Sequence, residues 1–302
     1  MTVLTNSIEE IFCEHFDYPK EAAYLIPFFF EKEEIDFIVN CEKETFTNKD
    51  YPEEFLKDAY KKGLVSFEDK EKQLYKLSNF YGMLDVFVCC RKEKYDELSK
   101  EEKKLLDDWY FRAYFEGLGD DYSQKPTKDE VLTLEEVCDF IDKDDRQIYL
   151  NFCDCRALRG DCGLLPKTCL TYRDAPNSFT DRGISEKISK EEAKQIVKES
   201  DKNGLMHTVN PNGICNCCSD CCYLFRSQKL RDSAGIWPAT QKIIAFDADK
   251  CIGCGKCTKR CHFGIFEQAN KREKVTCNPS ACVGCGLCVN TCPTKALTLI
   301  MR

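Results

Sequence analysis

The chain has 302 residues, of which 43% are hydrophobic and 32% are charged, proportions of an ordinary globular protein with room for two or three domains. Its net charge of −8 disfavours nucleic acid as a partner and suits docking onto a basic surface of another protein. The longest apolar run, Tyr24 to Phe30, is too short for an integral membrane segment. The start MTVLTNSIEE lacks a secretory pattern, so we expect a cytoplasmic protein with reduced thiols.

Helix and strand signals alternate in the N-terminal third. Residues 31–44 and 51–62 predict helices, Gly63 predicts the stop of the second, and residues 64–78 predict a hairpin. This order resembles a winged-helix unit, which we assign to residues 1–90. Residues 31–80 hold nine lysines against thirteen acidic residues, a net charge of −4 that repels phosphate. We therefore expect a protein-contact domain and no binding of nucleic acid.

Residues 91–147 are rich in charged and aromatic side chains and predict a charged helical connector. The sequence contains neither the glycine-rich nor the phosphate-binding motif of nucleotide sites, and neither HExxH nor GxSxG. No nucleotide-binding motif therefore supports a nucleotide partner.

Residues 148–235 predict an α+β domain that is rich in cysteine. A strand at 148–152 runs into Cys153-Asp-Cys-Arg156, and a helix begins at the capping box of Ser189 and Glu192 and ends at Asn203-Gly204. The segment LMHTV, a turn and the segment CNCCSDCC follow. The candidate metal ligands are Cys153, Cys155, Cys162, Cys169, Cys215, Cys217, Cys218, Cys221 and Cys222.

Nine thiols within 70 residues of a reduced protein favour a metal centre, because free thiols at this density are prone to oxidation. An iron-sulfur cluster is the favoured interpretation, with structural zinc and reactive thiols as alternatives. Directly adjacent cysteines seldom both bind one ion. His207, Asp154, Arg156 and Asp220 are the candidates for polar chemistry beside the centre.

The C-terminal segment repeats one motif. CIGCGKCTKRC begins at Cys251 and CVGCGLCVNTC begins at Cys282, and both have the spacing C-x2-C-x2-C-x3-C. Three cysteines at this spacing can hold three corners of a 4Fe-4S cubane if the glycines between them turn the loop tightly. A pair of structural zinc sites is the alternative, but such sites use pairs of cysteines rather than this triple plus one.

This repeat and its flanking strand signals resemble bacterial dicluster ferredoxins over residues 243–300. The resemblance implies that the fourth cysteine of each motif serves the other cluster. One 4Fe-4S cluster is then assigned to Cys251, Cys254, Cys257 and Cys292, and the other to Cys282, Cys285, Cys288 and Cys261. His262 stands where these ferredoxins usually have proline, and Cys277 lies outside both motifs.

The order CDCR, CNCC and dicluster motif is similar to a family of ferredoxin-domain proteins of anaerobic prokaryotes. The expected fold class is α+β multidomain: a mostly helical, winged-helix-like start, the cysteine-rich α+β domain, and a ferredoxin-like module at 241–302. The resemblance implies an electron-transfer protein or subunit that passes low-potential electrons to a redox partner protein. An iron-sulfur oxidoreductase acting at the middle centre and a redox-responsive regulator are the alternatives, so a catalytic role stays open.

Overall fold

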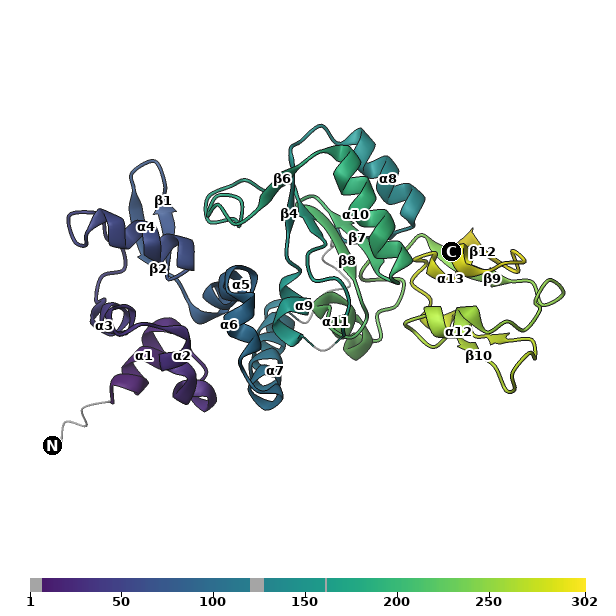
Figure 1. Ribbon diagram of the computed structural model, residues 1–302, viewed down its shortest axis with the longest axis horizontal. Helices are drawn as coiled ribbons and strands as arrows, with labels where there is room; N and C mark the ends of the chain where they lie inside the picture. Colours follow the sequence, from purple (N-terminus) through teal and green to yellow (C-terminus); the bar gives the residue numbers. More distant parts are fainter. Residues whose placement is uncertain (1–6, 120–127, 161) are drawn as a thin grey trace. The chain divides into compact units, whose positions relative to one another are not determined.

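The computed structural model describes residues 7–119, 128–160 and 162–302, and the chain divides into two compact units (Figure 1). The first comprises residues 1–113, 157–160 and 174–185, and the second comprises 114–156, 161–173 and 186–302. Within the described ranges, no helix has the length and apolar character needed to cross a membrane.

The first unit is mostly helical around an aromatic core. Phe12, Phe30 and Phe80 are almost fully buried, and the rings of Phe12 and Phe30 meet edge to face at 4.9 Å between centroids. Its elements are α1 (Ile8–Phe16), η1 (Lys20–Leu25), α2 (Ile26–Phe29), α3 (Lys32–Asn40), α4 (Glu53–Lys62), β1 (Val65–Asp69), β2 (Leu74–Leu77), α5 (Phe80–Cys90), α6 (Lys92–Asp96) and most of α7 (Lys100–Gly117).

A hairpin of β1 and β2 follows α4, with Val65 opposite Leu77. The distant segment 174–185 is fastened to it. Asn177 exchanges two hydrogen bonds with the backbone of Phe67, at 2.7 and 2.9 Å, and the buried Arg182 guanidinium donates to the carbonyl of Val65 at 3.1 Å. The expected helix, stop and hairpin are present, while the winged-helix designation stays a prediction.

The second unit is built on a six-stranded antiparallel sheet in the order β3-β7-β8-β5-β4-β6. Its strands are β3 (Glu130–Leu132), β4 (Ile148–Asn151), β5 (Cys169–Thr171), β6 (Glu186–Ile188), β7 (Met206–Asn210) and β8 (Gly213–Cys217). Its helices are α8 (Leu134–Lys143), α10 (Lys190–Lys202) and α11 (Tyr223–Arg231), and the first half of α9 (Asp154–Arg159) belongs to it as well. The segment 91–147, expected to be helical, thus also supplies β3, which pairs with β7.

Helices α8 and α10 lie together against one face of this sheet (Figure 1). Val137 and Val197 from the helices pack with Leu170, Val209 and Ile214 from the strands in one buried apolar cluster. The capping box predicted for α10 is confirmed, because Ser189 and Glu192 make both reciprocal hydrogen bonds. The cysteines of the sheet strands lie on the opposite face.

The last sixty residues add a small module of two strand pairs and two short helices. Strands β9 (Lys242–Phe246) and β12 (Leu297–Met301) pair antiparallel, as do β10 (Phe266–Glu267) and β11 (Thr276–Cys277). Helices α12 (Lys256–Arg260) and α13 (Leu287–Thr291) each begin at a glycine with left-handed backbone, and η2 (Pro279–Ala281) precedes the second motif. The two motifs therefore fold as matching halves.

Gly213 at the start of β8 has no room for a side chain. A Cβ there would lie 2.2 Å from the carbonyl oxygen of Leu170 and 3.1 Å from Cα of Thr171 on β5. We predict that Gly213→Ala lowers the free energy of unfolding by about 2 kcal/mol, because β8 must move away from β5. Chemical unfolding followed by circular dichroism measures this loss.

Gly117→Ala provides the matched control, since a Cβ at Gly117 meets no atom of the described residues within 4 Å. This change should leave the free energy of unfolding within about 0.5 kcal/mol of the wild type. Equal stability of Gly213→Ala and the wild type would contradict the close pairing of β5 and β8.

Candidate metal centres

The pleat of the central strands sorts side chains between the two faces of the sheet. On β8, Ile214 belongs to the apolar core under the helices, so its neighbours Cys215 and Cys217 project from the opposite face. The same alternation places Cys169 of β5 beside them, because Leu170 belongs to the helix-side core. Three cysteines from two neighbouring strands thus share one face.

Cys153 and Cys155 follow the end of β4, and Cys222 immediately precedes α11. These three thiols join the three on the sheet. We name this set the six-thiol group. Each of its thiols hydrogen-bonds to two others, and together they form a closed ring in the order Cys153, Cys155, Cys222, Cys217, Cys215 and Cys169. Of these, Cys153, Cys217 and Cys222 are buried as whole residues.

Hydrogen bonds among neighbouring thiols shift the pKa values within the six-thiol group. They lower the pKa of Cys153, Cys222 and Cys215, the last to about 5. The same bonds raise the pKa of the other three thiols. Buried thiolates at this density suit metal coordination, for which every ligand must lose its proton.

The other three cysteines of this domain form a second set. The Sγ atoms of Cys162, Cys218 and Cys221 all lie within 4.8 Å of one another, and Cys162 hydrogen-bonds to both of the others. We name these residues the three-thiol group. The nine predicted ligands are therefore brought together as two sets, not as one.

Arg156 lies among the thiols of both groups. Its guanidinium donates to the carbonyl of Asn216 at 2.7 Å and to Thr168 Oγ1 at 3.1 Å, and its Nε has no hydrogen-bond partner among the described residues. Burial lowers the pKa of this guanidinium, but the thiolates of Cys153 and Cys218 outweigh burial and raise it. A fixed buried cation thus compensates thiolate charge, and its free Nε–H is a donor for a sulfur ligand.

His207 lies away from the thiols. It belongs to the helix-side face of β7, where its Nδ1 is 2.6 Å from Asn216 Oδ1 and its Nε2 is 3.9 Å from Asp201 Oδ2. Its ring is fully buried, and the pleat directs it to the face opposite Cys215. His207 therefore forms a buried polar pair with Asn216 and does not lie beside the sulfur atoms. Asp154, in contrast, groups with Cys153 and Cys155 within 4.8 Å.

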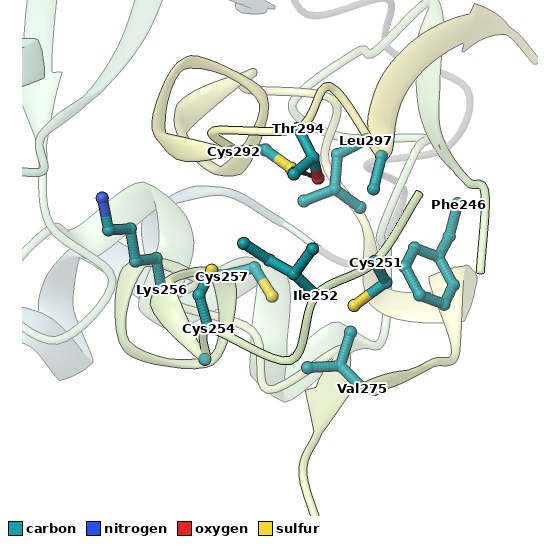
Figure 2. A pocket seen from close by; sticks show the side chains of 12 residues that line it. Phe246, Cys251, Ile252, Cys254, Lys256, Cys257, Val275, Cys292, Thr294 and Leu297 are labelled. Atoms are coloured by element: carbon teal, nitrogen blue, oxygen red, sulfur yellow. Dashed lines mark hydrogen bonds between the residues drawn. The ribbon is translucent and has the colours of Figure 1, made fainter. Parts of the chain in front are cut away.

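In the C-terminal module the cysteines surround two separate pockets. Cys251, Cys254, Cys257 and Cys292 line the first pocket together with Ile252 and Leu297. Figure 2 shows these residues around the pocket, with Cys292 contributed by a segment distant in sequence from the other three cysteines. We name this the first module pocket.

The second module pocket is lined by Cys282, Cys285, Cys288 and Cys261, with Phe263 and Leu287 among its apolar walls. Each pocket therefore takes three cysteines from one motif and the fourth from the other. Backbone amides support the sulfurs: Gly284 N–H donates to Cys282 Sγ at 3.4 Å and Phe263 N–H donates to Cys261 Sγ at 3.5 Å. Such donors stabilise thiolates that carry a metal cluster.

The first turn of the second motif requires glycine. Gly284 has φ of 68°, and a Cβ there would lie 2.4 Å from the carbonyl oxygen of Lys242. Burial raises the pKa of Cys285 at this turn to about 12, so an electrophile is needed to keep it deprotonated at neutral pH. Compact apolar pockets, four thiols each and tight glycine turns fit a 4Fe-4S cubane.

Comparison with known families agrees with this geometry. Residues 244–299 match the model of the 4Fe-4S dicluster domain. This segment is a ferredoxin-like iron-sulfur domain. No curated protein and no solved structure matched the chain. The resemblance of the dicluster domain is thus supported, while the winged-helix unit and the link with anaerobes remain predictions, and so does the assignment of each cysteine to a cluster.

The structure also places residues on which the sequence was silent or open. His262 of the dicluster domain bridges to the sheet, with Nε2 at 2.6 Å from the Gly204 carbonyl oxygen and Nδ1 at 3.4 Å from Ser219 Oγ. A neutral imidazole satisfies both, donating at one nitrogen and accepting at the other. Cys277 on β11 is not among the residues that line the two module pockets, and burial raises its pKa to about 11.

Exchange of the fourth cysteine between motifs can be tested by substitution. We predict that Cys292→Ser loses the cluster of the first module pocket, whereas Cys261→Ser loses that of the second, each removing about four of about eight irons. Iron analysis and electron paramagnetic resonance (EPR) of anaerobically prepared protein measure the loss.

Combining Cys292→Ser with Cys251→Ser identifies the pocket, because both residues line the first one. This double variant should lose no more iron than Cys292→Ser alone. A loss of both clusters from the double variant, with one retained in the single variants, would contradict the assignment. Cys277→Ser is the control and should retain all iron.

Proposed function

We propose that this protein is an electron-transfer protein that holds two 4Fe-4S clusters in its dicluster domain and a further metal centre in the six-thiol group. The observation that carries the proposal is the arrangement of eight cysteines, four around each module pocket, within a segment that matches a 4Fe-4S dicluster domain. When bound, each cluster accepts and releases one electron. The residues around it hold it, exclude water and connect it to its neighbours.

A continuous apolar cluster supports a connection between the dicluster domain and the six-thiol group. It contains Cys217 and Cys222 of the six-thiol group, and Cys285 of the second module pocket packs against it. Within the cluster, Phe225 of α11 meets Phe263 of the module with ring centroids 5.7 Å apart. Direct packing of this kind gives electrons a short, dry path between the two sites.

Polar contacts hold the two parts of this path in register. Besides the bridge through His262, Arg260 donates to the carbonyl of Lys202 at 2.9 Å, and Asn290 Nδ2 donates to Asp201 Oδ2 at 3.3 Å. All of them join the C-terminal end of α10 to the module. A fixed separation between redox centres follows from this set of contacts.

The first module pocket provides the exit to a partner. Cys254 is exposed there, and Ile252 beside it is 62% exposed, whereas Cys282 and Cys288 of the second pocket are buried. Electrons therefore exchange with a redox partner protein at the first pocket and reach the six-thiol group through the second. The net charge of −8 favours a partner with a basic docking surface.

The six-thiol group can be tested separately from the dicluster domain. We predict that Cys215→Ser removes the metal of the six-thiol group, because Cys215 contacts both Cys169 and Cys217, and leaves the irons of the dicluster domain in place. Metal binding here contributes to folding, so the thermal unfolding transition of the second unit should broaden. Metal analysis and calorimetry of anaerobically prepared protein check both effects.

Cys138→Ser on α8 is the matched control, since Cys138 belongs to neither thiol group. It should retain the full metal content. Unchanged metal content and melting of Cys215→Ser would show that the six-thiol group binds no metal and would favour reactive cysteines instead.

A further inference from the structure

The three-thiol group has the geometry of a site of its own. We propose that Cys162, Cys218 and Cys221 bind a single tetrahedral metal ion of the zinc type, separate from the iron-sulfur sites. This site lies outside the proposed electron path and does not depend on it. Its ligands come from the turn that follows β8 and from the loop between α9 and β5.

The spacing of the sulfur atoms favours one ion over a cluster. Tetrahedral thiolates at a zinc–sulfur distance of 2.3 Å lie about 3.8 Å from each other, and the three Sγ atoms fall within 4.8 Å of one another. A cubane instead keeps its cysteine sulfurs apart by its own body. Among the described residues, two groups of three possible ligand atoms lie within 4.8 Å of one another, and neither contains a cysteine of the dicluster domain. In that domain the thiols are separated by the module pockets.

Adjacent cysteines point to different sites, which keeps the two thiol groups distinct. Cys217 belongs to the six-thiol group and Cys218 to the three-thiol group, and the same division separates Cys222 from Cys221. The apolar surroundings differ as well. Cys218 and Cys221 pack with Leu205, whereas Cys217 and Cys222 pack with Phe225. A single centre cannot include both members of each adjacent pair in this arrangement.

Asp220 stands between Cys218 and Cys221 in sequence, and its carboxyl hydrogen-bonds to the Cys218 thiol. Its carboxylate oxygens are not among the ligand atoms that meet within 4.8 Å, so a water molecule would complete the tetrahedral site. Three thiolates around a divalent ion carry a formal charge of about −1. Arg156 and Lys229 offset this charge, because each interacts electrostatically with Cys218 and Lys229 also with Asp220.

Such an ion would have a structural task. It would fasten the loop that carries Cys162 to the turn after β8, across 56 residues of chain, and so reduce the conformational freedom of the loop that also carries Cys169. The ion would thereby hold β5, and with it Cys169 of the six-thiol group, in a fixed position.

Zinc and iron per chain, measured on the full-length protein purified anaerobically, test the proposal. The wild type should hold about one zinc per chain, and Cys162→Ser should lose it while keeping all iron and the EPR signals. Asp220→Asn should retain about one zinc per chain, because its side chain lies outside the set of sulfur ligands. Cys138→Ser is the control and should match the wild type.

Several outcomes would overturn the proposal. A wild type without tightly bound zinc, or loss of iron from Cys162→Ser, would assign the three-thiol group to an iron-sulfur cluster or to free thiols. Retention of the zinc by Cys221→Ser would remove the three-thiol group as its ligand set, even if Cys162→Ser fails to fold. A wild type that holds no iron in its dicluster domain would contradict the proposed function. The zinc measurement would still test the three-thiol group in that case.

Discussion

The antiparallel pairing of β8 with β5 on one side and β7 on the other determines where the cysteines face. Ile214 fits under α8 and α10, so Cys215 and Cys217 must project from the opposite face. A shift of one residue would bury them under the helices and expose Ile214. Because Gly213 admits β5 at close range, the register is enforced by backbone contact as well as by the apolar core. Both thiol groups depend on this register.

Charge imposes the second constraint. Buried thiols cannot be ionised together without compensation. Arg156, held by the Asn216 carbonyl and Thr168, supplies a fixed positive charge to the thiols of both groups. A metal ion or cluster supplies the rest, which couples the folding of this domain to metal binding. In the dicluster domain, backbone amides donate hydrogen bonds to Cys261 and Cys282 Sγ and so stabilise the charge of the thiolates.

The sequence predicts the parts of this structure that depend on local spacing. Two copies of C-x2-C-x2-C-x3-C suffice to indicate the dicluster domain, because each motif wraps its own pocket. The capping box of Ser189 and Glu192 likewise indicates the start of α10, because the two residues lie only three positions apart. Strand β3 escaped prediction because three residues between charged segments carry little periodic signal. The division of the nine middle cysteines escaped it too, since the division depends on which strands pair and in what register.

Redox titration of the full-length protein, prepared anaerobically and followed by EPR together with iron analysis, tests the central claim most directly. The account predicts about eight irons in the dicluster domain and, on reduction, signals of two 4Fe-4S clusters that interact magnetically at the short separation of the two module pockets. Zinc in place of iron in that domain, or iron that gives no signal at any potential, would contradict it.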